Sequence, residues 1–221
     1  MAKICVIGIG YKPLGKKARN IIYDSEVILA SSRLFEVFKG YEEFELVKDK
    51  IEVIDNVDKT IEFMKSQING RLITVLASGD PMFVGIGRRI INEFGKDLIE
   101  IFPDLSSMQI AFARIKESWD DAFLMSLHGR RDITKRKPEY ELNDIPVLLR
   151  SHGKIGILTD TENNPAAIAK ILHSSPVTDK APTMYVCQKL GYPDERITTG
   201  TPAEIISESF LEPNVVIILS S

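Results

Sequence analysis

Three junctions in this chain place small or polar residues directly after apolar runs typical of buried strands. Gly8-Ile9-Gly10 follows the run at 3–7, Ser78-Gly79-Asp80-Pro81 follows the run at 71–77, and Asp104-Leu105-Ser106-Ser107 follows the run at 98–102. Glycine has no Cβ, so a ligand can come close to the backbone at such a turn. If the runs are parallel strands, their carboxyl ends share one edge of a sheet, where ligands bind. We therefore expect the three junctions to form the wall of one site for an adenosine-like ligand.

The Gly8-x-Gly10 turn raises the alternative of a dinucleotide site, but the details disagree. The dinucleotide fingerprint needs a third glycine where Pro13 stands. It also needs an acidic residue at the end of the second strand to hold a ribose, and Ser31-Ser32 occupy that place. The sequence therefore argues against NAD and leaves two readings, a tight turn without a ligand or a close approach of another ligand.

Asp80 and the glycines that follow it also have two readings. Asp80 and Pro81 suit the cap and the first turn of a helix expected from about Met82 to Phe94. Gly85 and Gly87 each cost a helix roughly 1 kcal/mol relative to alanine. Glycines at these positions suit a ligand or another chain lying close to the backbone, so Asp80 is either a plain helix cap or part of a ligand site.

A basic segment follows the expected strand at 122–127. Five basic residues and one acidic residue lie between His128 and Pro138. The segment is either a solvated linker or a cluster that binds carboxylates or phosphates, for which arginine is well suited. Leu158-Thr159-Asp160 is a further strand end, and capping of the helix that begins near Pro165 explains most of its polar residues.

Metal and nucleophile chemistry have little support in the sequence. Cys5 and Cys187 each lie inside an apolar run, which is typical of buried thiols. The three histidines, at positions 128, 152 and 173, lack the spacing of metal ligands. We expect no metal site, and no Ser-His-Asp set or Walker loop is present.

The elements that must position these residues alternate between strand and helix. Strand-like runs at 3–7, 26–30, 71–77, 98–102 and 122–127 are separated by helical patterns, of which 16–23 and 57–68 are the clearest. Such alternation predicts an α/β fold with a mostly parallel five-stranded sheet. Further strands at 154–158, 183–188, 196–199 and 214–219 predict a second, mixed sheet. We expect an N-terminal α/β domain at 1–127, a linker at 128–145, a C-terminal α/β domain at 146–221, and a ligand cleft between the two domains.

Composition narrows the class of protein. The chain has 221 residues, a formal net charge of −3 and 44% hydrophobic residues, the mix of an ordinary globular protein. Its charge argues against a general nucleic-acid binder. Its longest apolar run, at 215–219, is far below the ~20 residues that span a bilayer. The N-terminus lacks a signal-peptide pattern, so we expect a cytoplasmic protein with no membrane partner.

In combination, these motifs resemble the tetrapyrrole methylase superfamily of two-domain S-adenosylmethionine-dependent methyltransferases. The resemblance spans essentially the whole chain and rests on Val6–Gly10, on Ala77–Pro81 with Gly85-Ile86-Gly87, and on Pro103-Asp104-x-Ser106-Ser107. Leu127–Arg130 and Leu158–Pro165 look like the cobalamin-pathway branch that methylates carbon 5 of precorrin or cobalt-precorrin. A similar domain forms the N-terminal half of bifunctional C(5,15)-methyltransferases.

The resemblance implies a site for S-adenosylmethionine as co-substrate and a second site for a tetrapyrrole. It implies His128 and Arg130 as contacts for the carboxylates of the macrocycle, and it leaves the proton-abstracting base unassigned. It also implies a homodimer or a higher homo-oligomer. Because the chain stops at Ser221, the decarboxylating C(15)-methyltransferase would be a separate, cooperating protein. The implied cofactor contacts are Ile9, Gly79, Asp80, Phe83, Ser106, Ser107 and Leu158.

One feature departs from the family pattern, and rival functions stay open. The family usually has proline directly after the first Gly-x-Gly, whereas this chain continues with Tyr11-Lys12-Pro13. Within the same fold, diphthine synthase and ribosomal RNA 2′-O-methyltransferase are alternatives, although an RNA enzyme would need a broad basic face. A tetrapyrrole-binding module without catalysis is the alternative from a different class.

Overall fold

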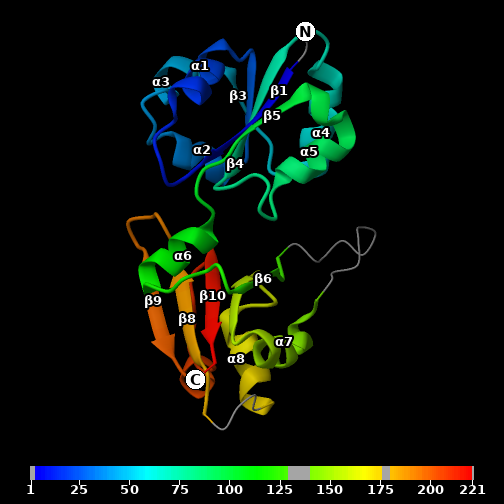
Figure 1. Ribbon diagram of the computed structural model, residues 1–221. Helices are drawn as coiled ribbons and strands as arrows, with labels where there is room; N and C mark the ends of the chain where they lie inside the picture. Colours follow the sequence, from blue (N-terminus) through cyan, green and yellow to red (C-terminus); the bar gives the residue numbers. More distant parts are fainter. Residues whose placement is uncertain (1–2, 129–139, 176–179, 221) are drawn as a thin grey trace. The chain divides into compact units, whose positions relative to one another are not determined.

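The computed structural model describes residues 3–128, 140–175 and 180–220 and divides into two units, Met1–Ser106 and Ser107–Ser221 (Figure 1). Each unit is built on its own five-stranded sheet. Within the described ranges, no helix has the length and apolar character needed to cross a membrane.

The sheet of the first unit is parallel throughout, as the alternation of elements predicts. Its strand order is β3-β2-β4-β1-β5. The inner strands β1 and β4 are buried on both faces, which explains why their sequences are nearly continuous apolar runs. The strands are β1 (Lys3–Ile9), β2 (Val27–Ala30), β3 (Ile51–Val53), β4 (Leu72–Ser78) and β5 (Ile99–Phe102).

Helices cover both faces of this sheet, because successive side chains of each strand point to opposite sides. Ile7 and Ile9 of β1 share a core with α1, α2 and α3, whereas Ile4 and Val6 share a core with α4 and α5. Figure 1 shows the two helix groups on opposite sides of the sheet. The helical segments of this unit are α1 (Lys16–Asp24), α2 (Ser32–Phe38), α3 (Phe44–Val47), η1 (Lys48–Lys50), α4 (Val57–Gln67), α5 (Ile86–Phe94) and η2 (Lys96–Leu98).

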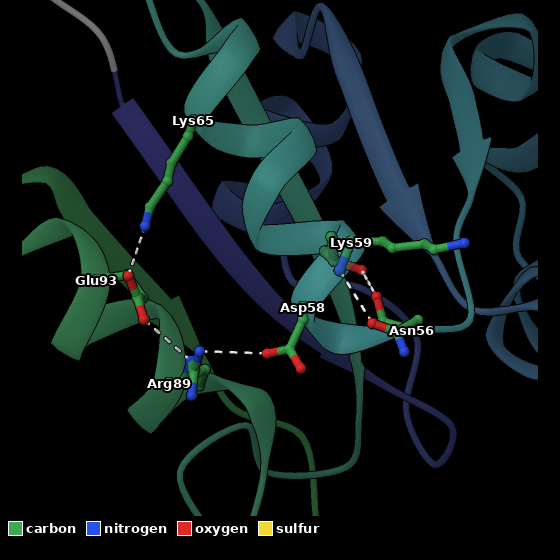
Figure 2. A network of polar contacts seen from close by, with 7 residues as sticks. Asn56, Asp58, Lys59, Lys65, Arg89 and Glu93 are labelled. Atoms are coloured by element: carbon green, nitrogen blue, oxygen red, sulfur yellow. Dashed lines mark hydrogen bonds and ion pairs between the residues drawn. The ribbon is translucent and has the colours of Figure 1, made fainter. Parts of the chain in front are cut away.

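A chain of ion pairs links α4 to α5 on the outer surface (Figure 2). Lys65 Nζ on α4 lies 2.8 Å from Glu93 Oε2 on α5. Arg89, also on α5, lies between two carboxylates. Its Nε is 3.2 Å from Glu93 Oε1, and its Nη2 is 3.2 Å from Asp58 Oδ1 on α4. Arg89 and Glu93 are partly exposed, and ion pairs near the surface contribute little individually, so this network adds only modestly to the packing of α4 against α5.

The second unit contains the mixed sheet that the sequence predicts. Its order is β6-β7-β10-β8-β9, with β6 and β7 parallel and the remaining neighbours antiparallel. The strands are β6 (Phe123–Ser126), β7 (Lys154–Leu158), β8 (Thr183–Gln188), β9 (Arg196–Gly200) and β10 (Asn214–Leu219). The helical segments are α6 (Ser107–Ile115), η3 (Leu142–Asp144), α7 (Ile145–His152), α8 (Pro165–Ser174) and α9 (Pro202–Ile205).

One sequence prediction about this architecture was wrong. The strand expected at 122–127 forms as β6 but pairs with β7 in the second sheet, while β3 completes the first sheet. The chain therefore passes between the units after Ser106 and not after residue 127. In addition, the expected linker at 128–145 ends in the helical segment η3, which continues into α7, and its residues 129–139 lie outside the described ranges.

Local features of this fold include helix caps and the buried thiols that the sequence predicts. Ser31 caps α2 by accepting a hydrogen bond from Leu34 N, and Thr201 and Glu204 form a capping box at α9. Cys5 and Cys187 are buried free thiols. Burial raises the pKa of the Cys187 thiol to about 12 and raises the pKa of Cys5 as well, so both are held as neutral thiols.

Candidate functional site

The carboxyl ends of β1, β4 and β5 converge, as the sequence predicts. Gly79 N, just after β4, donates to Ile9 O at the end of β1 over 2.9 Å. Gly79 O in turn accepts from Asp104 N, which follows β5, over 3.2 Å. Main-chain hydrogen bonds thus tie together three segments that lie far apart in the sequence.

Glycine is required at two positions of this junction because backbone meets backbone there. A Cβ at Gly8 would overlap the carbonyl oxygen of Gly79 and lie 2.6 Å from Asp104 N. Gly79 has a φ of +58°, and a Cβ on it would lie 2.6 Å from Leu105 O. Neither neighbour is a flexible side chain that could move aside. The glycines of this edge therefore serve the close packing of the three strand ends.

Asp104 fixes the loop that follows β1. Its Oδ2 accepts hydrogen bonds from Tyr11 N at 2.7 Å and from Lys12 N at 3.2 Å, and its Oδ1 accepts from Leu105 N at 2.7 Å. The residue is only 8% exposed. Our sequence reading placed Asp104 in the wall of the site but did not identify it as the anchor of this loop.

Tyr41 holds the same loop from the other side. Its hydroxyl oxygen accepts a hydrogen bond from Gly10 N over 2.7 Å. Burial raises the pKa of the Tyr41 hydroxyl, although the bond from Gly10 acts in the opposite direction. Nothing in the sequence pattern pointed to this residue. A pocket of about 290 Å³ opens beside it, lined by Tyr11, Lys12, Pro13, Arg19, Gly40, Tyr41, Glu42 and Glu43.

The Asp80 loop differs from its sequence-based description. Helix α5 begins at Ile86 with Gly85 as its N-cap, so Asp80 does not cap it. Instead, Asp80 Oδ1 accepts from Met82 N at 2.8 Å and its carbonyl accepts from Phe83 N at 3.1 Å, which closes a turn. Asp80 and Phe83 are both partly buried.

The expected reason for Gly85 and Gly87 also needs correction. A Cβ on either residue would collide with the carbonyl oxygen of Pro81, and Gly87 N donates to that oxygen over 3.0 Å. The chain's own backbone, at Pro81, is therefore what lies close to both glycines. Val84 is the exposed residue between Phe83 and Gly85. Its φ of +57° is a strained conformation for a β-branched residue.

The remaining predicted residues lie at and beyond the division between the units. Ser106 is buried and ends the first unit, whereas Ser107 is the first residue of α6 in the second. Leu158 is the last residue of β7, and its carbonyl accepts from Leu127 N over 2.8 Å. Five of the predicted cofactor residues, at positions 9, 79, 80, 83 and 106, thus belong to the first unit.

His128 lies just past the carboxyl end of β6 and is exposed. Its Nδ1 lies 3.2 Å from the carbonyl oxygen of Thr159. A carbonyl can only accept, so Nδ1 carries the proton in this contact and a neutral ring presents Nε2 as an acceptor. Thr159 is itself held in place, because its hydroxyl lies within 2.7 Å of two oxygens of Asn214. Arg130, the other predicted substrate contact, lies outside the described residues.

The chain has two α/β units, and in the first the loops at the carboxyl ends of a parallel sheet converge. This is the architecture that the sequence predicts for a two-domain methyltransferase, and comparison with known proteins tests that class. Residues 3–206 match the model of the Tetrapyrrole (Corrin/Porphyrin) Methylases, and the chain belongs to this family. The family and the methyltransferase class predicted from the motifs are thereby confirmed.

One sequence relative agrees with this assignment, and two solved structures share the fold. The chain is 28% identical over 212 residues to a probable cobalt-precorrin-7 C(5)-methyltransferase of Methanocaldococcus jannaschii, covering 94% of this chain and 93% of the relative. The solved precorrin-6Y methylase of Archaeoglobus fulgidus superposes with a TM-score of 0.69 at 23% identity, covering 98% and 96% of the two chains. A uroporphyrin-III C-methyltransferase of Thermus thermophilus, solved with S-adenosylhomocysteine, gives a TM-score of 0.70 at 15% identity and covers 99% and 97%.

Proposed function

We propose that this protein transfers a methyl group from S-adenosylmethionine to carbon 5 of a precorrin or cobalt-precorrin intermediate of cobalamin biosynthesis. The observation that carries the proposal is the main-chain junction of Ile9, Gly79 and Asp104, which holds three strand ends together. The chain that contains this junction belongs to a family of methylases. The relative from M. jannaschii, which matches along nearly its whole length, supports carbon 5 of cobalt-precorrin-7 as the acceptor.

The first unit supplies most of the cofactor contacts in this proposal. Because Gly8 and Gly79 let the three strand ends pack closely, the loops that follow these strands are held together at one edge of the sheet, where ligands of such folds bind. When bound, S-adenosylmethionine supplies an activated methyl group, so the protein needs to position the reactants and exclude water. Asp80 is the polar anchor, Ile9 and Phe83 give apolar contact, and Ser106, Ser107 and Leu158 complete the set.

On the substrate side, the proposal assigns carboxylate contacts to His128 and Arg130. Since Nδ1 of His128 points to Thr159 O, a bond from Nε2 to a carboxylate requires the ring to carry a proton on both nitrogens. Arginine offers a bidentate contact to the same kind of group. If the tetrapyrrole contains cobalt, the ion belongs to the substrate.

The proposal also covers the oligomeric state of the protein and its place in the cell. It describes a cytoplasmic homodimer or higher homo-oligomer that cooperates with a separate decarboxylating C(15)-methyltransferase. Analytical ultracentrifugation at several protein concentrations tests the oligomeric state, and a single monomeric species would refute that part.

Two measurements test the activity. Calorimetry with S-adenosylhomocysteine should show binding, and its absence would remove the methyltransferase assignment. Incubation with ¹³C-methyl-labelled S-adenosylmethionine and cobalt-precorrin-7 should then give a product one methyl group heavier. Carbon NMR should place the label on carbon 5, and a label on another carbon would refute the proposed regiochemistry.

A pair of variants tests the substrate side. Arg130→Ala should weaken tetrapyrrole binding while leaving S-adenosylhomocysteine affinity unchanged. The matched control is Arg150→Ala, which removes an exposed arginine of α7. Equal loss of both affinities in Arg130→Ala would indicate a folding role, and equal behaviour of the two variants would remove Arg130 from the site.

A further inference from the structure

We infer that Asp104 is a built-in anion for the Gly10–Lys12 loop, and that its carboxylate both sets the loop geometry and keeps phosphate-bearing ligands out of it. The inference rests on the proposed function in one respect, namely that Ile9, the residue directly before this loop, contacts the cofactor. Asp104 is a positioning and specificity residue in this account and takes no part in the chemical step.

The evidence is the set of hydrogen-bond acceptors of three consecutive backbone N–H groups. Gly10 N donates to the hydroxyl of Tyr41, whereas Tyr11 N and Lys12 N both donate to Oδ2 of Asp104. The carboxylate comes from a position 93 residues beyond Tyr11. It is buried, and its second oxygen is held by Leu105 N. Side chains from two distant segments thus satisfy every N–H group of the turn.

Consecutive N–H groups that point to one place form an anion-binding site. In nucleotide-binding folds, the phosphate of the ligand sits at such a turn after the first strand. Here the carboxylate of Asp104 takes that place, which leaves no free donor for a phosphate and adds a repelling charge. S-adenosylmethionine has no phosphate and carries positive charge, so it is compatible with a carboxylate at this position.

Asp104→Gly provides a direct test, because it removes a group with the size and charge of acetate. We expect the affinity for S-adenosylhomocysteine to fall roughly 10- to 100-fold, the usual effect of losing charged hydrogen bonds. Millimolar acetate should restore most of it by filling the space, whereas acetamide, which has the same shape and no charge, should not. Equal effects of acetate and acetamide, or no effect of either, would overturn the inference.

A second readout does not depend on the proposed function. The midpoint of thermal unfolding should rise in acetate or inorganic phosphate for Asp104→Gly, relative to chloride at the same ionic strength, because an anion that binds only the folded state stabilises it. The wild-type protein should show no such rise. Equal responses of the two proteins would contradict a built-in anion, even if S-adenosylhomocysteine binds neither of them.

Two further variants separate a specific role from general destabilisation. Glu204→Ala is the matched control, since Glu204 also accepts a backbone N–H group, that of Thr201, over 2.7 Å in the second unit. It should lose stability without changing S-adenosylhomocysteine affinity and without rescue by acetate. Asp104→Asn keeps the side-chain shape and loses the charge, so it should bind S-adenosylhomocysteine more weakly than wild type and should not respond to acetate. Wild-type affinity in Asp104→Asn would overturn the inference.

Discussion

Replacing Gly8 with alanine should break the junction on which the site is built. The new Cβ would overlap Gly79 O and lie 2.6 Å from Asp104 N, whereas ordinary contact requires about 3.4 Å or more. Since the new Cβ would lie only 1.9 Å from Gly79 O, the strand ends must part by about 1.5 Å. The Gly79–Ile9 and Asp104–Gly79 hydrogen bonds, now 2.9 and 3.2 Å long, cannot survive that movement.

The expected cost follows from these contacts. Two backbone hydrogen bonds contribute about 1 kcal/mol each, and forcing an extra carbon into a closely packed place costs about 1–3 kcal/mol. We therefore expect Gly8→Ala to lower the free energy of unfolding by about 3–5 kcal/mol and to abolish S-adenosylhomocysteine binding in the fraction that still folds.

Urea unfolding followed by circular dichroism measures this change. Gly40→Ala is the matched control, because a Cβ there meets only Val37 O at 3.4 Å and the residue does not have a positive φ. It should change the free energy of unfolding by less than about 1 kcal/mol. A loss of less than about 1 kcal/mol in Gly8→Ala would show that the junction adjusts easily, contrary to our reasoning.

Three other predictions concern separate parts of the molecule. Asp80→Ala should weaken S-adenosylhomocysteine binding roughly tenfold by calorimetry, and an unchanged affinity would leave Asp80 as a residue of the turn alone. Arg89→Gln should lower the free energy of unfolding by about 0.5–1 kcal/mol at low salt, and the difference from wild type should shrink at high salt, since the ion pairs of Figure 2 lie near the surface and are partly exposed. Cys187 ionises in the unfolded chain near its ordinary pKa of 9.0 but in the folded protein only near about 12. Stability should therefore fall as the pH rises above 9, by up to about 1.4 kcal/mol per pH unit for this group, and Cys187→Ala should lack that contribution. Identical pH slopes in the two proteins would contradict the raised pKa.

The core of the first unit and the convergence of its three strand ends were predictable because their signals are local. Apolar runs that end in glycine-rich turns mark β1 and β4, and the side of the sheet on which their loops meet follows from parallel topology alone. Caps such as Ser31 and the Thr201–Glu204 box depend on residues three apart, so the sequence reveals them directly.

The errors have physical causes as well. The strand β3 has only three residues, two of them exposed, and therefore leaves no apolar run. The alternation of strand and helix continues unchanged from β5 through α6 to β6, so nothing local tells which sheet β6 joins. Helix α7 does carry signals that our reading left unused, a proline in its first turn and Gly153 in the left-handed conformation at its end.

Asp104 and Tyr41 were missed for a different reason. Their role depends on bonds to a loop that lies 93 and 31 residues away, and no periodicity in the sequence records such a distance. The sequence predicts that Asp104 lies at a strand end. It does not predict that the carboxylate of Asp104 turns back toward Tyr11 and Lys12.

The junction of Ile9, Gly79 and Asp104 is made of peptide groups, which every amino acid carries. Side chains around the junction can therefore change without breaking it, provided that Gly8 and Gly79 are retained and that the loop anchors Asp104 and Tyr41 are kept. A solved structure that shares this fold at 15% identity fits with such freedom. Such freedom also means that the neighbouring loops can change their specificity for the methyl acceptor while the main-chain junction, at which we expect the methyl donor to bind, stays the same.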